Sequence, residues 1–199
     1  MKIVVVGATG TIGKFVVAAL QGRHDVVKVG NRGGDHRVDI TDTNSIRALF
    51  KAIGRFDALV ATTGKVHFGE LASMTEKELQ IGLQSKLMGQ INLVLIGRDH
   101  TNDNGSFTLT SGLLNHDPIR YGAAASLVNG ALDGFVVGAA IEMPRGLRLN
   151  VVSPGVLVES LPAFGDYFRG FEAVPGKRVA EAYVKSVEGL QTGKVISVL

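Results

Sequence analysis

The chain has 199 residues, 45% of them hydrophobic and 26 of them glycine, which predicts one compact domain over 1–199. It contains no cysteine, so disulfides, thiolate metal sites and a cysteine nucleophile are excluded. The formal charge of +3 comes from scattered residues, with neither a basic stripe for nucleic acid nor an uninterrupted apolar run for a membrane. We expect a cytoplasmic protein without nucleic-acid or membrane partners.

Apolar runs alternate with amphipathic stretches along the chain, which is typical of a parallel sheet covered by helices on both faces. In the first half, the pattern predicts strands at 2–6, 26–30, 37–40 and 57–61 and helices at 13–21 and 43–53. In the second half, it predicts helices at 75–97, 123–143 and 177–188 and strands at 106–110, 147–152 and 194–199. Thr75 and Glu78 predict a capping box at the start of the long helix. This order predicts a three-layer, Rossmann-like, doubly wound α/β domain with a parallel sheet of about seven strands.

A glycine-rich turn, GATGTIG, follows the first strand directly. Glycines spaced three apart let the backbone approach a pyrophosphate and aim the next helix N-terminus at it. The position between a strand and a helix favours a dinucleotide site over a purely structural turn, which stays the alternative. The residues predicted to bind there are Gly7, Thr9, Gly10, Thr11, Ile12 and Gly13.

Four further motifs follow in order: VDITD at 38–42, DALVATTG at 57–64, SKLMG at 85–89, and TLTSG at 108–112. With PRGLRLNVVSPG at 144–155, they resemble short-chain dehydrogenase/reductases over almost the whole chain. The resemblance implies a nicotinamide dinucleotide and oxidoreductase chemistry on a small carbonyl or alcohol substrate. It assigns further cofactor contacts to Asp39, Ile40, Ala61, Thr62, Thr63, Gly64, Asn129, Pro154, Gly155 and Val156.

The end of the second strand bears on which dinucleotide binds. A carboxylate there would hydrogen-bond both ribose hydroxyls and repel a 2′-phosphate. This chain has Gly30, Asn31 and Arg32 instead, and the first carboxylate after this strand is that of Asp35. The amide of Asn31 and the guanidinium of Arg32 suit a phosphate. We therefore predict NADP(H), while NAD(H), with Arg32 a solvated loop residue, stays the alternative.

The resemblance also implies a catalytic serine, here Ser111, and a tyrosine and a lysine four residues apart on the next helix. The lysine would lower the pKa of the phenol, about 10 when free, and bind the nicotinamide ribose. Counting along the helix without gaps places Ala125 at the tyrosine position and Asn129 at the lysine position, with Tyr121 one turn too early. Lys86 replaces the family's helix asparagine. The sequence therefore predicts a degenerate active site.

Two functions are compatible with this site. In one, the protein is an atypical reductase in which the Lys86 ammonium replaces the lost charge near the cofactor while Ser111 holds a carbonyl oxygen. In the other, it is a non-catalytic dinucleotide-binding sensor or interaction module. The alternative for Lys86 itself is a solvated helix residue.

Three other features lead to weaker expectations. The histidines show no metal-ligand spacing, so no metal site is predicted, and His116 is either at the mouth of the site or on the surface. The small-residue helix over 123–143 would allow close packing in a homodimer or homotetramer. The aromatic-rich segment 161–175 predicts either a mobile substrate lid or a loop packed on the core.

Overall fold

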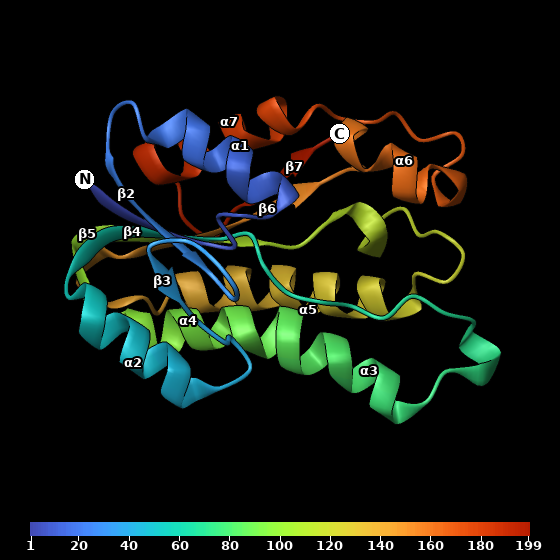
Figure 1. Cartoon of the computed structure of the whole chain (residues 1–199), viewed down its shortest axis with the longest axis horizontal. Helices are drawn as coiled ribbons and strands as arrows, with labels where there is room; N and C mark the ends of the chain where they lie inside the picture. The colour runs from blue at the N-terminus through green and yellow to red at the C-terminus, as the bar shows by residue number, and fades with distance from the viewer.

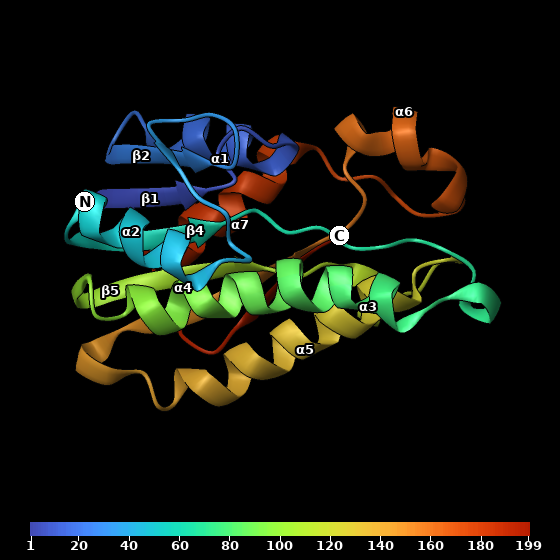
Figure 2. The same cartoon turned by 60° about the horizontal axis from the view of Figure 1, so that its bottom comes forward.

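The computed structural model describes residues 1–199 and has three layers, with a sheet between two layers of helices (Figures 1 and 2). The sheet has seven parallel strands in the order β3-β2-β1-β4-β5-β6-β7. Its strands are β1 (Lys2–Val6), β2 (Asp25–Gly30), β3 (His36–Arg37), β4 (Phe56–Ala61), β5 (Thr101–Thr110), β6 (Arg148–Pro154) and β7 (Val195–Val198). The predicted doubly wound sheet is confirmed. The strand order reverses between β1 and β4, where such folds form a ligand crevice.

Helices cover both faces of the sheet. One face carries α1 (Thr11–Leu20) and α7 (Gly176–Glu188), with α6 (Leu161–Phe164) beyond the strand ends (Figure 1). The other face carries α2 (Thr43–Ile53), α3 (Glu76–Gly82), α4 (Gly89–Gly97) and α5 (Ala123–Ala140). Successive side chains of a strand point to opposite faces, so Ile3 and Val5 join a core of 17 buried residues while Val4 and Val6 join one of 22.

The predicted helix over 75–97 is interrupted. Its capping box is present, because Thr75 accepts from the Glu78 backbone and Glu78 accepts from the Thr75 backbone. Between α3 and α4, however, Leu83–Met88 forms a π-helix. The side-chain amide of Gln90 donates to the Lys86 carbonyl at 3.1 Å, and such a side chain inserted into the backbone ladder disturbs the regular pattern.

Other element boundaries differ from the prediction for local reasons. β3 covers His36–Arg37 rather than 37–40, because Asp39 accepts from the Thr41 backbone and turns the chain away from the sheet. β5 begins at Thr101, and the irregular pairing near Phe56 accommodates the early start. α5 ends at Ala140 instead of 143, ahead of the turn Pro144–Gly146.

α5 is long and apolar enough to cross a membrane by length and composition, although it contains Asp133. In the structure this helix packs against the sheet, and 44% of its 18 residues are buried. Leu132 and Val136 of α5 are fully buried in the larger core. A core helix therefore accounts for its composition.

Candidate functional site

Two adjoining cavities lie at the carboxyl ends of the strands. The first, here called the glycine cavity, has a volume of about 560 Å³ and is lined by Val6, Gly7, Thr9, Gly10, Gly30, Asn31, Val38, Asp39, Ile40, Thr41, Thr62, Thr63, Gly64, Lys65, Ile81, Gln84 and Ser85. The second, here called the lysine cavity, has a volume of about 330 Å³ and includes Lys86, Ser111, Ala125 and Asn129 in its lining. Thr62, Thr63 and Gly64 line both, so the two cavities adjoin along this segment, and together they are here called the groove.

The turn after β1 requires glycine. Gly7 has a φ of +90°, and a Cβ there would lie 2.5 Å from the Thr62 carbonyl oxygen. A Cβ on Gly13 would lie 2.0 Å from the Gly7 carbonyl oxygen, so the helix can pack onto the turn only without a side chain. Gly10 caps α1 without a side-chain hydrogen bond, which leaves first-turn N–H groups available to an anionic ligand. These residues fit a pyrophosphate.

Most residues predicted to bind the cofactor line one of the two cavities. In the glycine cavity these are Gly7, Thr9, Gly10, Asn31, Asp39, Ile40, Thr62, Thr63 and Gly64. In the lysine cavity they are Ile12, Thr62, Thr63, Gly64, Asn129, Pro154, Gly155 and Val156. Four predicted residues line neither cavity: Thr11, Gly13, Arg32 and Ala61.

Each of these four has a local explanation. Thr11 and Arg32 are exposed, Gly13 packs under the turn, and Ala61 is fully buried. Lys65 lines the glycine cavity and was not predicted from the sequence, although it directly follows the DALVATTG motif.

Asp39 lies on the rim of the glycine cavity with part of its carboxylate already engaged. Its Oδ1 accepts from the Thr41 hydroxyl at 2.7 Å and from the Thr41 backbone N–H at 2.9 Å. These two hydrogen bonds lower the pKa of Asp39, and the charge of Lys65 adds to them. Asp39 is therefore a fixed anion beside the groove.

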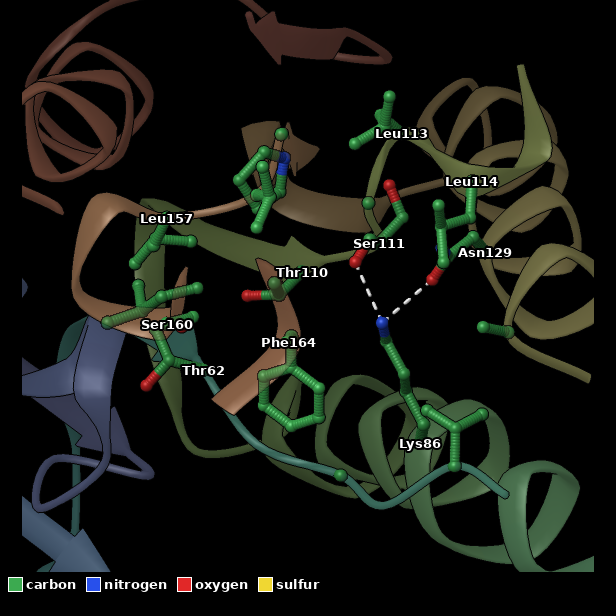
Figure 3. A pocket seen from close by; sticks show the side chains of 18 of the residues that line it. Thr62, Lys86, Thr110, Ser111, Leu113, Leu114, Asn129, Leu157, Ser160 and Phe164 are labelled. Carbon is green, nitrogen blue, oxygen red and sulfur yellow. Dashed lines mark hydrogen bonds between the residues drawn. The ribbon is translucent and has the colours of Figure 1, made fainter. Parts of the chain in front are cut away.

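Lys86 points into the lysine cavity rather than to solvent (Figure 3). Its Nζ donates to Asn129 Oδ1 at 2.7 Å and to the Ser111 carbonyl oxygen at 2.8 Å. Burial lowers the pKa of Lys86 to about 8, and the negative charge of Asp133 opposes part of that shift. Gly64, with a φ of +120°, packs directly on the lysine, since a Cβ there would lie 2.5 Å from Lys86 Cα.

Ser111 stands at the end of a tightly held strand. Gln90 accepts from the Thr110 backbone N–H at 2.8 Å and donates to its carbonyl at 2.9 Å. The Thr110 hydroxyl is bonded to Tyr183, whose pKa is raised by its burial. The Ser111 backbone N–H donates to Val152 at 2.9 Å, whereas its Oγ is buried and has no hydrogen-bond partner. Buried hydroxyls are normally paired, so this one is a candidate to hydrogen-bond a ligand.

Ala125 and Tyr121 occupy different environments. Ala125 lines the lysine cavity, one helical turn before Asn129. Tyr121 lies outside the lining, and its hydroxyl donates to Glu70 at 3.3 Å. The Tyr121 ring packs against that of Tyr167 with centroids 6.1 Å apart. No phenol hydroxyl therefore lines the lysine cavity.

The walls of the lysine cavity are mostly apolar. Phe164 and Phe168, from the segment after β6, line the cavity together with Val66, Phe68, Leu113, Leu114 and Leu157. Phe168 also packs on Phe171 and on the small buried cluster around Leu113. The aromatic segment thus packs on the core and lines the cavity at once. His116 lies outside the cavity, with a 67% exposed side chain, and its Nε2 is 3.6 Å from Asp133 Oδ2.

Comparisons with known proteins agree with this architecture. A family model described as "Enoyl-(Acyl carrier protein) reductase" matches residues 13–187. The crystal structure of the protein lin1944 from Listeria innocua is 47% identical, with a TM-score of 0.99 and complete coverage of both chains. A small-chain dehydrogenase solved in complex with NADPH has a TM-score of 0.88 at 24% identity, covering 100% of this chain and 96% of that one. That likeness shows the fold.

A curated relative is an uncharacterised oxidoreductase of Methylorubrum extorquens. It is 26% identical over 138 residues, which make up 67% of this chain and 56% of the relative. The chain spans little more than half the length of the curated relatives it matches.

Proposed function

This chain belongs to the short-chain dehydrogenase/reductase family, and we propose that it is an NADP(H)-dependent oxidoreductase that reduces a small carbonyl compound in the lysine cavity. The observation that carries the proposal is the position of the Lys86 ammonium. It lies in the cavity, within hydrogen-bond distance of Asn129 and of the Ser111 backbone. By the family resemblance, Lys86 stands at the position of the family's helix asparagine, and Asn129 stands at the position of its lysine. The two residue types are therefore exchanged between the two positions.

The glycine cavity is suited to hold the dinucleotide. The turn of Gly7 and Gly10 and the open N-terminus of α1 would bind its pyrophosphate. Asn31 lines the cavity, whereas the carboxylate of Asp35 accepts from the Lys28 backbone N–H at 2.8 Å and is engaged there. The NADPH bound by a solved neighbour of the same fold supports this choice of cofactor. When bound there, the dinucleotide would supply the hydride for the reduction.

The residues of this chain would supply the proton and the orientation. Ser111 Oγ, buried and without a partner, donates a hydrogen bond to the carbonyl oxygen. Lys86 holds a proton at Nζ, and its pKa of about 8 lies near neutral pH, where a general acid is most effective. Asn129 and the Ser111 carbonyl fix the position of that ammonium. Lys86 thus takes the part that a tyrosine plays in the family.

A second candidate function is a non-catalytic dinucleotide-binding sensor. What favours it is Ala125, which lines the lysine cavity and which the resemblance places at the position of the family's tyrosine. The hydroxyl of Tyr121 is bonded to Glu70 and does not replace it.

The test is NADPH oxidation against a panel of uncharged aldehydes and ketones, with NADPH affinity measured in parallel by calorimetry. We expect Lys86→Met to abolish turnover while the Kd for NADPH changes less than about twofold. The matched control is Lys51→Met, on an exposed position of α2. A Lys86→Met variant with full activity would refute the role of Lys86. Wild-type protein that binds NADPH but oxidises it with no compound supports the sensor instead.

A further inference from the structure

Lys86 is the one charged residue among the 21 that line the lysine cavity. No carboxylate and no arginine shares that lining, and about half of the lining is hydrophobic. Amines enclosed in apolar surroundings are the ones that act as nucleophiles towards carbonyl compounds. We propose that Lys86 is such a nucleophile and binds small, uncharged, apolar aldehydes covalently as a Schiff base.

The surroundings of Lys86 favour the neutral amine that this reaction needs. Desolvation disfavours the charged form, and the pKa of about 8 leaves about a tenth of the amine unprotonated at pH 7. An unperturbed lysine, with a pKa of about 10.4, would leave less than about a thousandth. The reactive form is therefore present at neutral pH in far greater proportion than at a surface lysine.

Hydrogen bonds orient the neutral amine. Its two N–H groups have two acceptors, Asn129 Oδ1 at 2.7 Å and the Ser111 carbonyl oxygen at 2.8 Å. When both N–H groups donate to these acceptors, the nitrogen lone pair occupies the remaining tetrahedral position, on the side away from them. Two other lining residues leave space there, because Ala125 has only a methyl group and Gly112 has no side chain. The cavity of about 330 Å³ has room for an aldehyde of the size of benzaldehyde.

The reaction balances with groups that are present. The lone pair of Nζ forms a bond to the aldehyde carbon, and the carbonyl oxygen becomes a hydroxyl. Ser111 Oγ, which is buried and has no partner, donates to that oxygen as its negative charge develops. The carbon–oxygen bond then breaks, and the oxygen leaves as water with the two amine protons. An imine between Lys86 and the aldehyde remains, and neither an oxidant nor a reductant is consumed.

The inference goes beyond the proposed function, since it requires the amine and the cavity but no dinucleotide. The test uses the full-length protein without cofactor, treated with benzaldehyde and sodium cyanoborohydride, which reduces an imine to a stable benzylamine. Peptide mass spectrometry then measures the labelling rate of each lysine. We expect Lys86 to be labelled at least about tenfold faster than the exposed Lys51 and Lys177 of the same molecule. In Lys86→Met, we expect the rapid label to be absent and the slow labelling of the other two lysines to be unchanged.

Labelling of Lys86 no faster than that of Lys51 and Lys177 would overturn the inference, and this comparison needs only the wild-type protein. NADPH oxidation is measured separately, without cyanoborohydride, with the panel of uncharged aldehydes and ketones, benzaldehyde included. Rapid labelling without turnover leaves the Schiff base standing and contradicts the proposed reductase. Turnover without rapid labelling supports the proposed reductase and contradicts the Schiff base.

Discussion

Replacing Lys86 by methionine tests the burial of its charge through stability alone. The folded protein holds this pKa at about 8, whereas an unfolded chain has the ordinary value of about 10.4. The unfolded state therefore binds the proton more tightly between these pH values. Folding carries the full cost of the buried charge below pH 8, and this cost disappears as pH rises towards 10.4. The wild type should gain stability relative to Lys86→Met over that window.

The magnitude follows from the width of the window. The folded and unfolded pKa values differ by roughly two units, which corresponds to about 3 kcal/mol. Methionine has no proton to donate, so it leaves Asn129 Oδ1 and the Ser111 carbonyl without their donor, at a cost of about 1–3 kcal/mol that does not depend on pH. We therefore expect similar stabilities at pH 7 and a variant less stable by a few kcal/mol near pH 10.

Urea denaturation of both proteins between pH 6 and pH 10, without cofactor, measures this difference. Groups common to both proteins cancel when the two free energies of unfolding are subtracted. Lys51→Met, at an exposed position, serves as the control and should show no such slope. A difference between wild type and Lys86→Met that stays constant from pH 7 to pH 10 would refute the reasoning.

Three further substitutions probe the groove. Ala125→Tyr introduces a phenol beside Lys86, and we expect NADPH-dependent reduction to rise about 100-fold, measured by initial rates. Gly64→Ala places a side chain against Lys86 at a φ of +120°, and we expect it to lower the free energy of unfolding by at least about 2 kcal/mol. Its control is Gly134→Ala, where the added methyl group meets open space, and we expect this change to raise the free energy of unfolding by about 0.5–1 kcal/mol. Asn31→Asp places a carboxylate in the glycine cavity and should weaken NADPH binding at least about tenfold relative to NADH, by calorimetry.

The sequence predicted those elements whose formation depends on local patterns. The strand Lys2–Val6 and the helix Thr43–Ile53 have their predicted bounds, because an apolar run and an amphipathic repeat are both local signals. In the structure, the side chain of Asp42 caps this helix by accepting from the Asn44 backbone N–H. The glycine turn was predicted from the GATGTIG motif that follows the first strand. The structure gives the reason for Gly7, because its positive φ and the close approach of Thr62 admit only glycine.

Features that depend on tertiary contacts were missed. The π-helix that contains Lys86 coincides with a hydrogen bond from the Gln90 side-chain amide to the Lys86 carbonyl. The same amide donates to the Thr110 carbonyl on β5, 20 residues further along the chain. No periodicity in the sequence signals such a contact. The short helix Leu161–Phe164 was missed as well, because it is only four residues long and the pattern there shows aromatic residues without a helical period.

Most residues predicted to bind the cofactor line one of the two cavities, but their arrangement could not be predicted from the sequence. The resemblance predicted that Lys86 and Asn129 stand at the positions of the family's asparagine and lysine. Whether the two side chains meet depends on the π-helix that carries Lys86 and on the close approach of Gly64, neither of which leaves a local signal. In the structure Lys86 Nζ donates to Asn129 Oδ1 at 2.7 Å, so the two side chains do meet. The Lys86 ammonium lies in a cavity that Ala125 also lines, and the small side chain of Ala125 leaves space there, which supports the proposal of a carbonyl compound beside Lys86.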